Sequence, residues 1–365
     1  MSQYDRLRLV AAATVGFACL AAACSADRGA QQANSESDPS SFQPPITQPT
    51  GQPTCSAPPP VEVAPCVVLV PDPRPGDLRV DDNADLLPAD YSPPAASSVI
   101  TDLHYGPDPA HRLDLYLPTE GSAPVMLFLH SGGWVGGTRA SVPPMVLRFV
   151  ERGYAVAAVD YRLAPEHAFP SAVEDAKRAV RWLKTADEVA AQVDGDRIVI
   201  YGTSAGGHLA AMVGAAPGTF EPTDLSPEME SVDSRVAGIV SVVGPTELQS
   251  FYTHPHAWAA GLTEALLGCS PCSEAELANA SPTSHLREGL PPAYWAYGEQ
   301  DCLVDPQTQG AVIASEWAVN SPSGSSWFDL IEGCAHNVDP TTINQRWVER
   351  FVDLAASGSD IPAIK

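Results

Sequence analysis

The serine of Gly202-Thr203-Ser204-Ala205-Gly206 has the setting that a catalytic nucleophile needs. An apolar stretch at 197–201 precedes it, and a stretch rich in Ala and Leu follows, so the pattern predicts a turn from a strand into a helix. Such a turn holds the hydroxyl above the end of the strand, and the flanking glycines avoid side-chain collisions. The pentapeptide also arises by chance in loops, so other residues must decide whether it is catalytic.

A second segment, His130-Ser131-Gly132-Gly133-Trp134, follows a buried apolar stretch at 125–129. Acyl transfer needs backbone N–H groups that stabilise an oxyanion, and these come from the nucleophile turn and from a loop after an earlier strand. Glycines allow such a loop to approach closely. In a chain that also has the Ser204 motif, a Gly pair after a buried strand favours an oxyanion loop over a turn that contains two glycines by chance.

A Ser-His-acid triad further requires an acid and then a histidine, each after a later strand. Asp301 follows the apolar stretch at 293–297, and His336 follows the stretch at 326–331. We favour Asp301 over Asp305 and Glu299, because an acid that orients a histidine belongs on rigid backbone near a strand end. The other candidate histidines precede this acid: His208, His254, His256 and His285.

The elements that must position these residues alternate between strands and helices. We expect strands at 99–105, 113–117, 125–129, 154–159, 197–201, 236–243, 293–297 and 326–331, and helices at 170–184, 205–213, 307–320 and 344–355. This alternation predicts an α/β fold with a mainly parallel sheet and helices on both faces. One catalytic domain at 99–358 accounts for it, with a candidate lid insertion at 246–290 and a tail at 359–365.

Composition and charge exclude several classes of function. The chain has 365 residues and is 44% hydrophobic, which suffices for a full core. Its 44 Asp and Glu outnumber its 20 Lys and Arg, giving a net charge of -24. Such a surface repels phosphate backbones and anionic lipids, so we expect no nucleic-acid partner.

The N-terminal segment has the features of an export signal. Arg6 and Arg8 precede an apolar stretch at 9–23, which has the length of a signal-peptide core. We predict a signal peptide at 1–23 and lipid attachment to Cys24, which would make this a lipoprotein of the cell envelope; cleavage after Ala23 and free secretion is the alternative. From 24 to 98 the chain is rich in Pro, Ser and Gln, with 15 of the 36 prolines, and we predict a tether there, with a short extended piece at 67–70.

Six of the eight cysteines lie beyond Cys24, and an even number in an exported chain indicates disulfides. Cys302 follows the proposed acid and Cys334 lies two residues before the proposed base, so we predict that they pair. The local pairs would then be Cys55–Cys66 and Cys269–Cys272. A redox or zinc site at Cys269 and Cys272 is the weaker interpretation, because no second histidine follows His285 closely.

Three ordered segments resemble a known family: Leu129-His130-Ser131-Gly132-Gly133-Trp134, Asp160-Tyr161-Arg162-Leu163-Ala164-Pro165-Glu166-His167-Ala168-Phe169-Pro170 and Gly202-Thr203-Ser204-Ala205-Gly206-Gly207-His208-Leu209-Ala210. They are similar to esterases of the α/β-hydrolase fold, above all the hormone-sensitive-lipase-like group and its bacterial feruloyl-esterase and kynurenine-formamidase-like relatives. Ser131 and Thr203 depart from the family pattern, so substrate choice does not transfer.

The resemblance implies a role for each site residue. Ser204 would be the nucleophile, His336 the base and Asp301 the acid, and the N–H groups of Gly132, Gly133 and Ala205 would form the oxyanion hole. Asp160, Arg162 and Glu174 would brace the loop behind the site.

The resulting hypothesis is an exported serine carboxylesterase that hydrolyses small or aryl esters through an acyl-enzyme, with no metal or organic cofactor. An arylformamidase or amidase would use the same triad, and a catalytically silent binding protein of this fold is a third hypothesis. Trp134, Trp258 and Trp295 would either line a substrate pocket or belong to the core.

Overall fold

The computed structural model describes residues 68–69, 98–119, 121–255, 257–322, 325–336, 343 and 345–361. The predicted signal peptide at 1–23, Cys24 and most of the predicted tether lie outside these residues. The predicted extended piece at 67–70 corresponds to the short strand β1, Val68–Leu69.

The described residues are built on a nine-stranded sheet in the order β1-β9-β8-β7-β6-β4-β5-β3-β2. The other strands are β2 Ser98–His104, β3 Arg112–Leu117, β4 Ala123–Leu129, β5 Ala155–Val159, β6 Val193–Thr203, β7 Gly238–Val242, β8 Ala293–Gly298 and β9 Ser326–Ile331. Strands β4 to β9 pair in parallel, whereas β1, β2 and β3 pair antiparallel with their neighbours. The carboxyl ends of the parallel strands therefore meet at one edge, where an open α/β sheet places its site.

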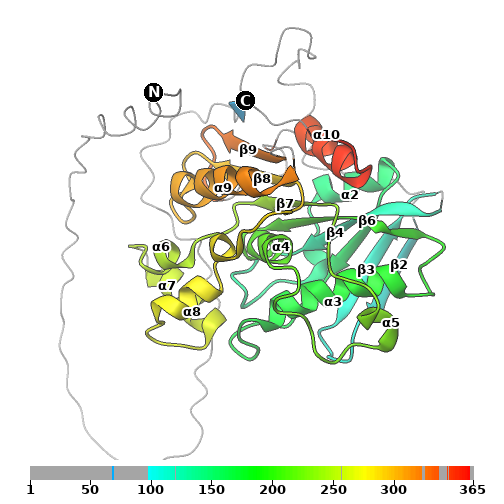
Figure 1. The fold of residues 1–365 in the computed structure, drawn as a ribbon, viewed down its shortest axis with the longest axis horizontal. Coiled ribbons are helices and arrows are strands. Elements are labelled where there is room, and N and C mark those ends of the chain that lie inside the picture. The colour runs from blue at the N-terminus through cyan, green and yellow to red at the C-terminus, as the bar shows by residue number, and fades with distance from the viewer. Residues whose placement is uncertain are drawn as a thin grey trace, which may run out of the picture. The chain divides into compact units, whose positions relative to one another are not determined.

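Helices cover both faces of this sheet (Figure 1). They are α2 Pro144–Glu151, α3 Ser171–Thr185, α4 Ala205–Ala215, α5 Pro227–Glu230, α6 Leu248–Tyr252, α7 Ala257–Leu267, α8 Glu274–Asn279, α9 Val312–Asn320 and α10 Gln345–Ala356, with shorter helical turns at η1 Arg139–Ser141, η2 Pro282–His285 and η3 Pro306–Ala311. Helices α3, α4 and α9 share one hydrophobic core, and α2 and α10 share the other. Among the described residues, no helix is long and apolar enough to cross a bilayer.

Strand β4 shows why the sheet needs cover on both sides. Val125, Leu127 and Leu129 lie in the core beneath α3 and α4, whereas Met126 and Phe128 lie in the core beneath α2 and α10. Successive side chains of a strand point to opposite faces, and an apolar residue at every position therefore requires two cores. The continuous apolar stretch that predicted a buried strand thus forms the middle of a three-layer structure.

A side chain of helix α3 contacts the C-terminal end of helix α4. The Lys177 side chain is fully buried, and its Nζ donates a hydrogen bond to the carbonyl of Ala216, 2.6 Å away at the C-terminal end of α4. Nζ also forms an ion pair with Glu221. A cation at the C-terminal end of a helix is favourable because unpaired carbonyls and the helix dipole make that end negative.

Asp329 is a carboxyl group whose burial should destabilise the protein at neutral pH. It lies on β9, accepts a hydrogen bond of 2.6 Å from the hydroxyl of Tyr294, and its Oδ1 has no partner among the described residues. Burial raises the pKa of Asp329 to about 6. The folded protein therefore binds this proton more tightly than the unfolded chain, so the contribution of Asp329 to stability falls as the pH rises from about 4 to 6.

We expect Asp329→Asn to stabilise the protein at pH 8 by roughly 1 to 2 kcal/mol, because the amide carries no charge and still accepts the Tyr294 hydroxyl. Thermal unfolding of both proteins at pH 8 and pH 5 checks this. The gain should shrink at pH 5, where Asp329 is largely protonated. An equal gain at both pH values would show that ionisation of Asp329 is not the cause.

Candidate active site

Ser204 lies at the sharp turn between β6 and α4, at the carboxyl edge of the sheet. Its backbone has φ 53° and ψ -116°, a conformation that side chains rarely adopt. A Cβ added to Gly206 would lie 2.0 Å from the carbonyl oxygen of Leu129, so only glycine allows α4 to pass this close to β4. The Ser204 N–H also donates to the carbonyl of Val242 on β7, at 2.8 Å. The turn is therefore fixed against both neighbouring strands.

Ser204, His336 and Asp301 form one chain of hydrogen bonds. The Oγ of Ser204 lies 3.0 Å from Nε2 of His336, and Nδ1 of His336 lies 2.9 Å from Oδ2 of Asp301. An ionised carboxylate only accepts hydrogen bonds, so Nδ1 carries the proton and Nε2 is free to accept from the serine hydroxyl. This is the tautomer that can take the serine proton.

The structure distinguishes Asp301 from the two reserve acids. The Asp301 side chain is fully buried, and its Oδ1 accepts the backbone N–H groups of Leu303 and Val304, both at 2.9 Å. Asp305 instead caps η3, where its Oδ1 accepts two backbone N–H groups. Glu299 accepts the N–H of Gly333 at 3.1 Å. Of the three acids, Asp301 is the one in contact with His336.

The loop after β4 contains the predicted oxyanion donors Gly132 and Gly133. Both have positive φ, 127° and 60°, and a Cβ at Gly132 would lie 2.1 Å from the carbonyl oxygen of Gly136. Within the described part of the chain, the backbone N–H groups of Gly132, Gly133 and Ala205 donate to no backbone acceptor. Donors without an internal partner are what an oxyanion site requires. Their role in catalysis stays a prediction.

Residues at both ends of this loop form hydrogen bonds with Asp160 and Tyr161, which directly follow β5. The Tyr161 hydroxyl donates to the carbonyl of His130 at 2.8 Å, and the two rings stack with centroids 4.1 Å apart. Asp160 accepts the backbone N–H of Arg139 at 2.5 Å and also pairs with its guanidinium.

The other two residues of the predicted brace, Arg162 and Glu174, form an ion pair. Arg162 pairs with Glu174 at 3.1 Å and with Asp175 at 2.7 Å. The Asp175 carboxylate is buried, and His111 and Arg162 hold its pKa below the usual range against the effect of burial. Asp160, Arg162 and Glu174 are thus all in ion pairs, and their partners include Asp175 and Arg139, which the sequence motifs did not indicate. His111 pairs with Asp175 in turn. The bracing role of these residues stays a prediction.

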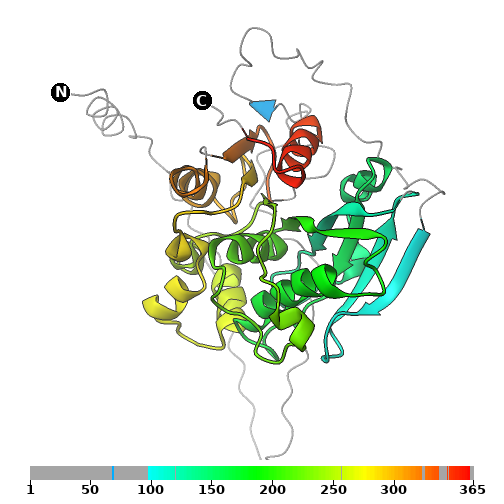
Figure 2. The same ribbon diagram turned by 45° about the vertical axis from the view of Figure 1, so that its right-hand side comes forward.

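The insertion at 246–290 contains α6, α7, α8 and η2, which form one group beside the sheet (Figure 2). The side chain of Leu262 on α7 faces the oxyanion loop, since a Cβ at Gly133 would lie 2.8 Å from its Cδ1. Trp258, one helical turn earlier on the same face, is 37% exposed. The insertion thus places apolar side chains next to the site. Trp134 and Trp295 are buried and belong to the hydrophobic core.

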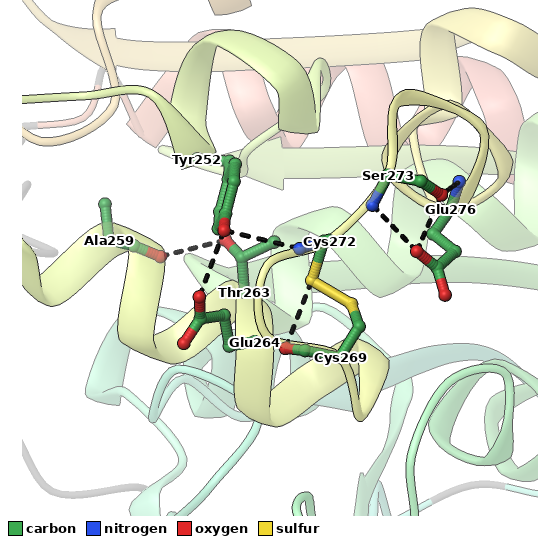
Figure 3. The surroundings of a disulfide bond; sticks show 8 residues. All are labelled: Tyr252, Ala259, Thr263, Glu264, Cys269, Cys272, Ser273 and Glu276. Carbon is green, nitrogen blue, oxygen red and sulfur yellow. Dashed lines mark hydrogen bonds between the residues drawn. A yellow bond between two sulfur atoms is a disulfide. The ribbon is translucent and has the colours of Figure 1, made fainter.

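A disulfide between Cys269 and Cys272, with an S–S distance of 1.97 Å, closes the turn between α7 and α8. Figure 3 shows Tyr252 of α6 beside it: the Tyr252 hydroxyl donates to Glu264 of α7 at 3.0 Å and accepts the N–H of Cys272 at 3.3 Å. Three segments of the insertion are therefore joined at one point. Sulfurs bonded to each other offer no thiolate to zinc, so the zinc interpretation has no support here. The redox interpretation stays an untested alternative.

Cys302 and Cys334 are each disulfide-bonded as well. The predicted pairing of Cys302 with Cys334 stays a prediction. Contact between Asp301 and His336 does not by itself give neighbouring sulfurs the Cβ directions that a disulfide needs. The predicted Cys55–Cys66 pair lies outside the described residues. Within the described residues, no group of three or more His, Cys, Asp or Glu is arranged to hold a metal ion.

Comparison with known proteins adds independent information. The BD-FAE family model matches residues 113–316, which include Ser204 and Asp301 but end before His336. Esterase LipC from Mycobacterium tuberculosis is 30% identical over 249 residues, which cover 63% of this chain and 60% of LipC. Carboxylesterase NlhH of the same species is 41% identical over 93 residues, 25% of this chain and 28% of NlhH. The chain spans about half to three fifths of the length of LipC and of two further mycobacterial relatives.

Solved structures share the fold. Thermogutta terrifontis esterase 2 phosphonylated by cyclosarin is 27% identical with a TM-score of 0.53, covering 72% of this chain and 92% of that protein. A truncated carbohydrate esterase from gut microbiota has a TM-score of 0.59 at 21% identity, covering 73% and 98%, and this likeness concerns the fold alone. The sheet and these neighbours confirm the predicted α/β-hydrolase fold.

Proposed function

The chain belongs to the BD-FAE family, and we propose that it is an exported serine carboxylesterase that hydrolyses small or aryl carboxylic esters through an acyl-enzyme. The observation that carries this proposal is the hydrogen-bonded chain from Ser204 through His336 to the buried Asp301. The names of LipC and NlhH as esterases support it.

The proposed reaction begins when Ser204 Oγ attacks the ester carbonyl carbon and its proton moves to Nε2 of His336. The negative charge on the carbonyl oxygen is stabilised by the N–H groups of Gly132, Gly133 and Ala205. His336 then gives its proton to the leaving alcohol oxygen as the ester C–O bond breaks. Water cleaves the acyl-enzyme by the same steps, with His336 taking a proton from water and returning it to Ser204.

The proposed preference for small or aryl groups rests on the apolar face of α7. Leu262 lies against Gly133, and Trp258 is partly exposed one turn away. Apolar and aromatic side chains bind the non-polar part of an ester, while the polar groups of the site orient its carbonyl. A substrate chain placed along this face would remain next to the oxyanion loop.

Hydrolysis of p-nitrophenyl esters of increasing acyl length tests the proposal, with a feruloyl ester and N-formylkynurenine in the same series. We expect turnover of the esters, with kcat/KM highest for short acyl chains or for the feruloyl ester. Faster hydrolysis of N-formylkynurenine than of every ester would favour an arylformamidase. No turnover of any substrate by folded protein would favour the silent binding protein.

We further propose that the protein is exported and anchored by lipid on Cys24. The sequence places this cysteine directly after an apolar signal-like segment. Replacement by Ala should move the protein from the detergent phase to the aqueous phase in a phase-partition experiment, because acyl burial contributes about 0.8 kcal/mol per CH₂. Mature chains that begin at an unmodified Cys24 would indicate free secretion instead.

A further inference from the structure

The side chain of Trp134, the residue directly after Gly133, is hydrogen-bonded to the side chain of His208 on helix α4. Its Nε1–H donates to Nδ1 of His208 at 3.1 Å, and the two rings meet edge to face with centroids 5.1 Å apart. Trp134 has a φ of 64°, so its backbone continues the left-handed conformation of Gly132 and Gly133. The indole is buried, and this contact links residues 74 positions apart.

The partners of His208 determine which nitrogen carries its proton. Nε2 of His208 lies 2.8 Å from the carbonyl oxygen of Ala280 in the insertion. A carbonyl oxygen only accepts, so Nε2 must be the N–H, and Nδ1 keeps the lone pair that accepts from Trp134. Both nitrogens are used only when the ring is neutral. The side chain is fully buried, and burial lowers the pKa of His208 to about 4, which keeps it neutral.

One imidazole therefore joins three parts of the site. His208 lies on α4, which begins directly after Ser204, while Trp134 belongs to the oxyanion loop and Ala280 to the insertion. Trp134 has two further contacts. Its backbone carbonyl accepts the N–H of Ala164 at 2.9 Å, and its ring makes an edge contact with Phe251 of α6. Of these contacts, the bond to His208 is the one that connects Trp134 to the nucleophile helix.

We propose that His208 is a positioning residue that sets the distance between the oxyanion loop and Ser204 by holding the Trp134 indole. This rests on the proposed esterase function, because it assigns a role in stabilising the oxyanion. Loss of the bond would let Gly132 and Gly133 move relative to the reacting carbonyl, where a displacement of about 1 Å can lower the rate by 10²-fold. Stabilisation of the transition state would weaken while ground-state binding would change little.

Three variants separate this role from a structural one. Trp134→Phe keeps the ring but removes the Nε1–H. His208→Asn keeps an acceptor near Nδ1 and loses the reach to Ala280, whereas His208→Gln keeps a donor near Nε2 and loses the acceptor for Trp134. The matched control is Trp317→Phe, which removes another buried indole bond, the 2.7 Å contact of Trp317 Nε1–H with the carbonyl of Pro291.

The kinetics of a p-nitrophenyl ester are measured with active sites counted by a p-nitrophenyl phosphonate, so that misfolded molecules do not contribute. We expect W134F and H208Q to lower kcat by about 10- to 100-fold with KM within about threefold, and H208N to retain most of kcat. The double variant W134F/H208Q should be no slower than the slower single variant, because both remove the same bond. W317F should lower the melting temperature and leave kcat unchanged.

Wild-type kcat in W134F and H208Q would overturn the proposal, and so would an equal loss in H208N and H208Q. The esterase function would then still stand if Ser204→Ala were inactive. If Ser204→Ala itself stayed active, the proposed function would fail, whatever the His208 variants showed.

Discussion

Ser204→Ala and His336→Ala should each abolish nearly all ester turnover, by on the order of 10^4-fold or more, because members of a triad act as a unit. Alanine at 204 removes the attacking oxygen, and alanine at 336 removes the base that lies 3.0 Å from it. The oxyanion donors remain in both variants and account for the small rate that is left. Steady-state hydrolysis of a p-nitrophenyl ester measures the loss.

A matched control is His285→Ala, since this histidine makes a 2.8 Å bond to the carbonyl of Asn279 and does not contact the triad. Its turnover should stay within about twofold of wild type, as expected for a change that does not touch a unit acting in the transition state. All three variants should unfold near the wild-type temperature. Retention of more than about a tenth of the wild-type rate by Ser204→Ala would show that the proposed mechanism is wrong.

Asp301→Asn should lower kcat by about 10^3- to 10^4-fold, and the surroundings of Asp301 explain why. The backbone N–H groups of Leu303 and Val304 fix an acceptor at Oδ1, so the amide oxygen of Asn must take that place. The NH₂ group then faces Nδ1 of His336 and forces the proton onto Nε2. In that tautomer, His336 cannot accept the proton of Ser204.

The control for this change is Asp305→Asn, which alters an acid four residues away that caps η3. It should affect stability slightly and leave kcat near that of wild type. Determination of kcat and melting temperature for both variants distinguishes the two acids. A larger loss of kcat in Asp305→Asn than in Asp301→Asn would transfer the role of the acid to Asp305.

The strands that position the triad were predictable because each is a short apolar stretch followed by polar residues or glycine. In a parallel sheet such stretches end at one edge, so the order Ser204, Asp301, His336 already indicated that they meet. The choice of Asp301 over Asp305 followed from its closeness to the end of β8. What distinguishes Asp301 in the structure is the contact of 2.9 Å between its Oδ2 and Nδ1 of His336.

The helices within the insertion at 246–290, and the contacts across it, were not predictable from periodicity. Helix α7 is apolar on nearly all sides and α6 has five residues, so neither shows the alternating pattern of an amphipathic helix. The bond between Trp134 and His208 joins segments that are distant in the sequence, and no local pattern reports such a contact.

Covalent labelling tests most directly whether Ser204 is the nucleophile. The protein is treated with a p-nitrophenyl alkylphosphonate, in which a serine oxygen would displace p-nitrophenolate from phosphorus and retain the phosphonyl group. Intact mass and peptide mapping should show one phosphonyl group per chain, carried by the peptide that contains Ser204, with activity lost in proportion to labelling. Complete inactivation with the label on another residue, or full labelling of Ser204 with turnover unchanged, would contradict the claim.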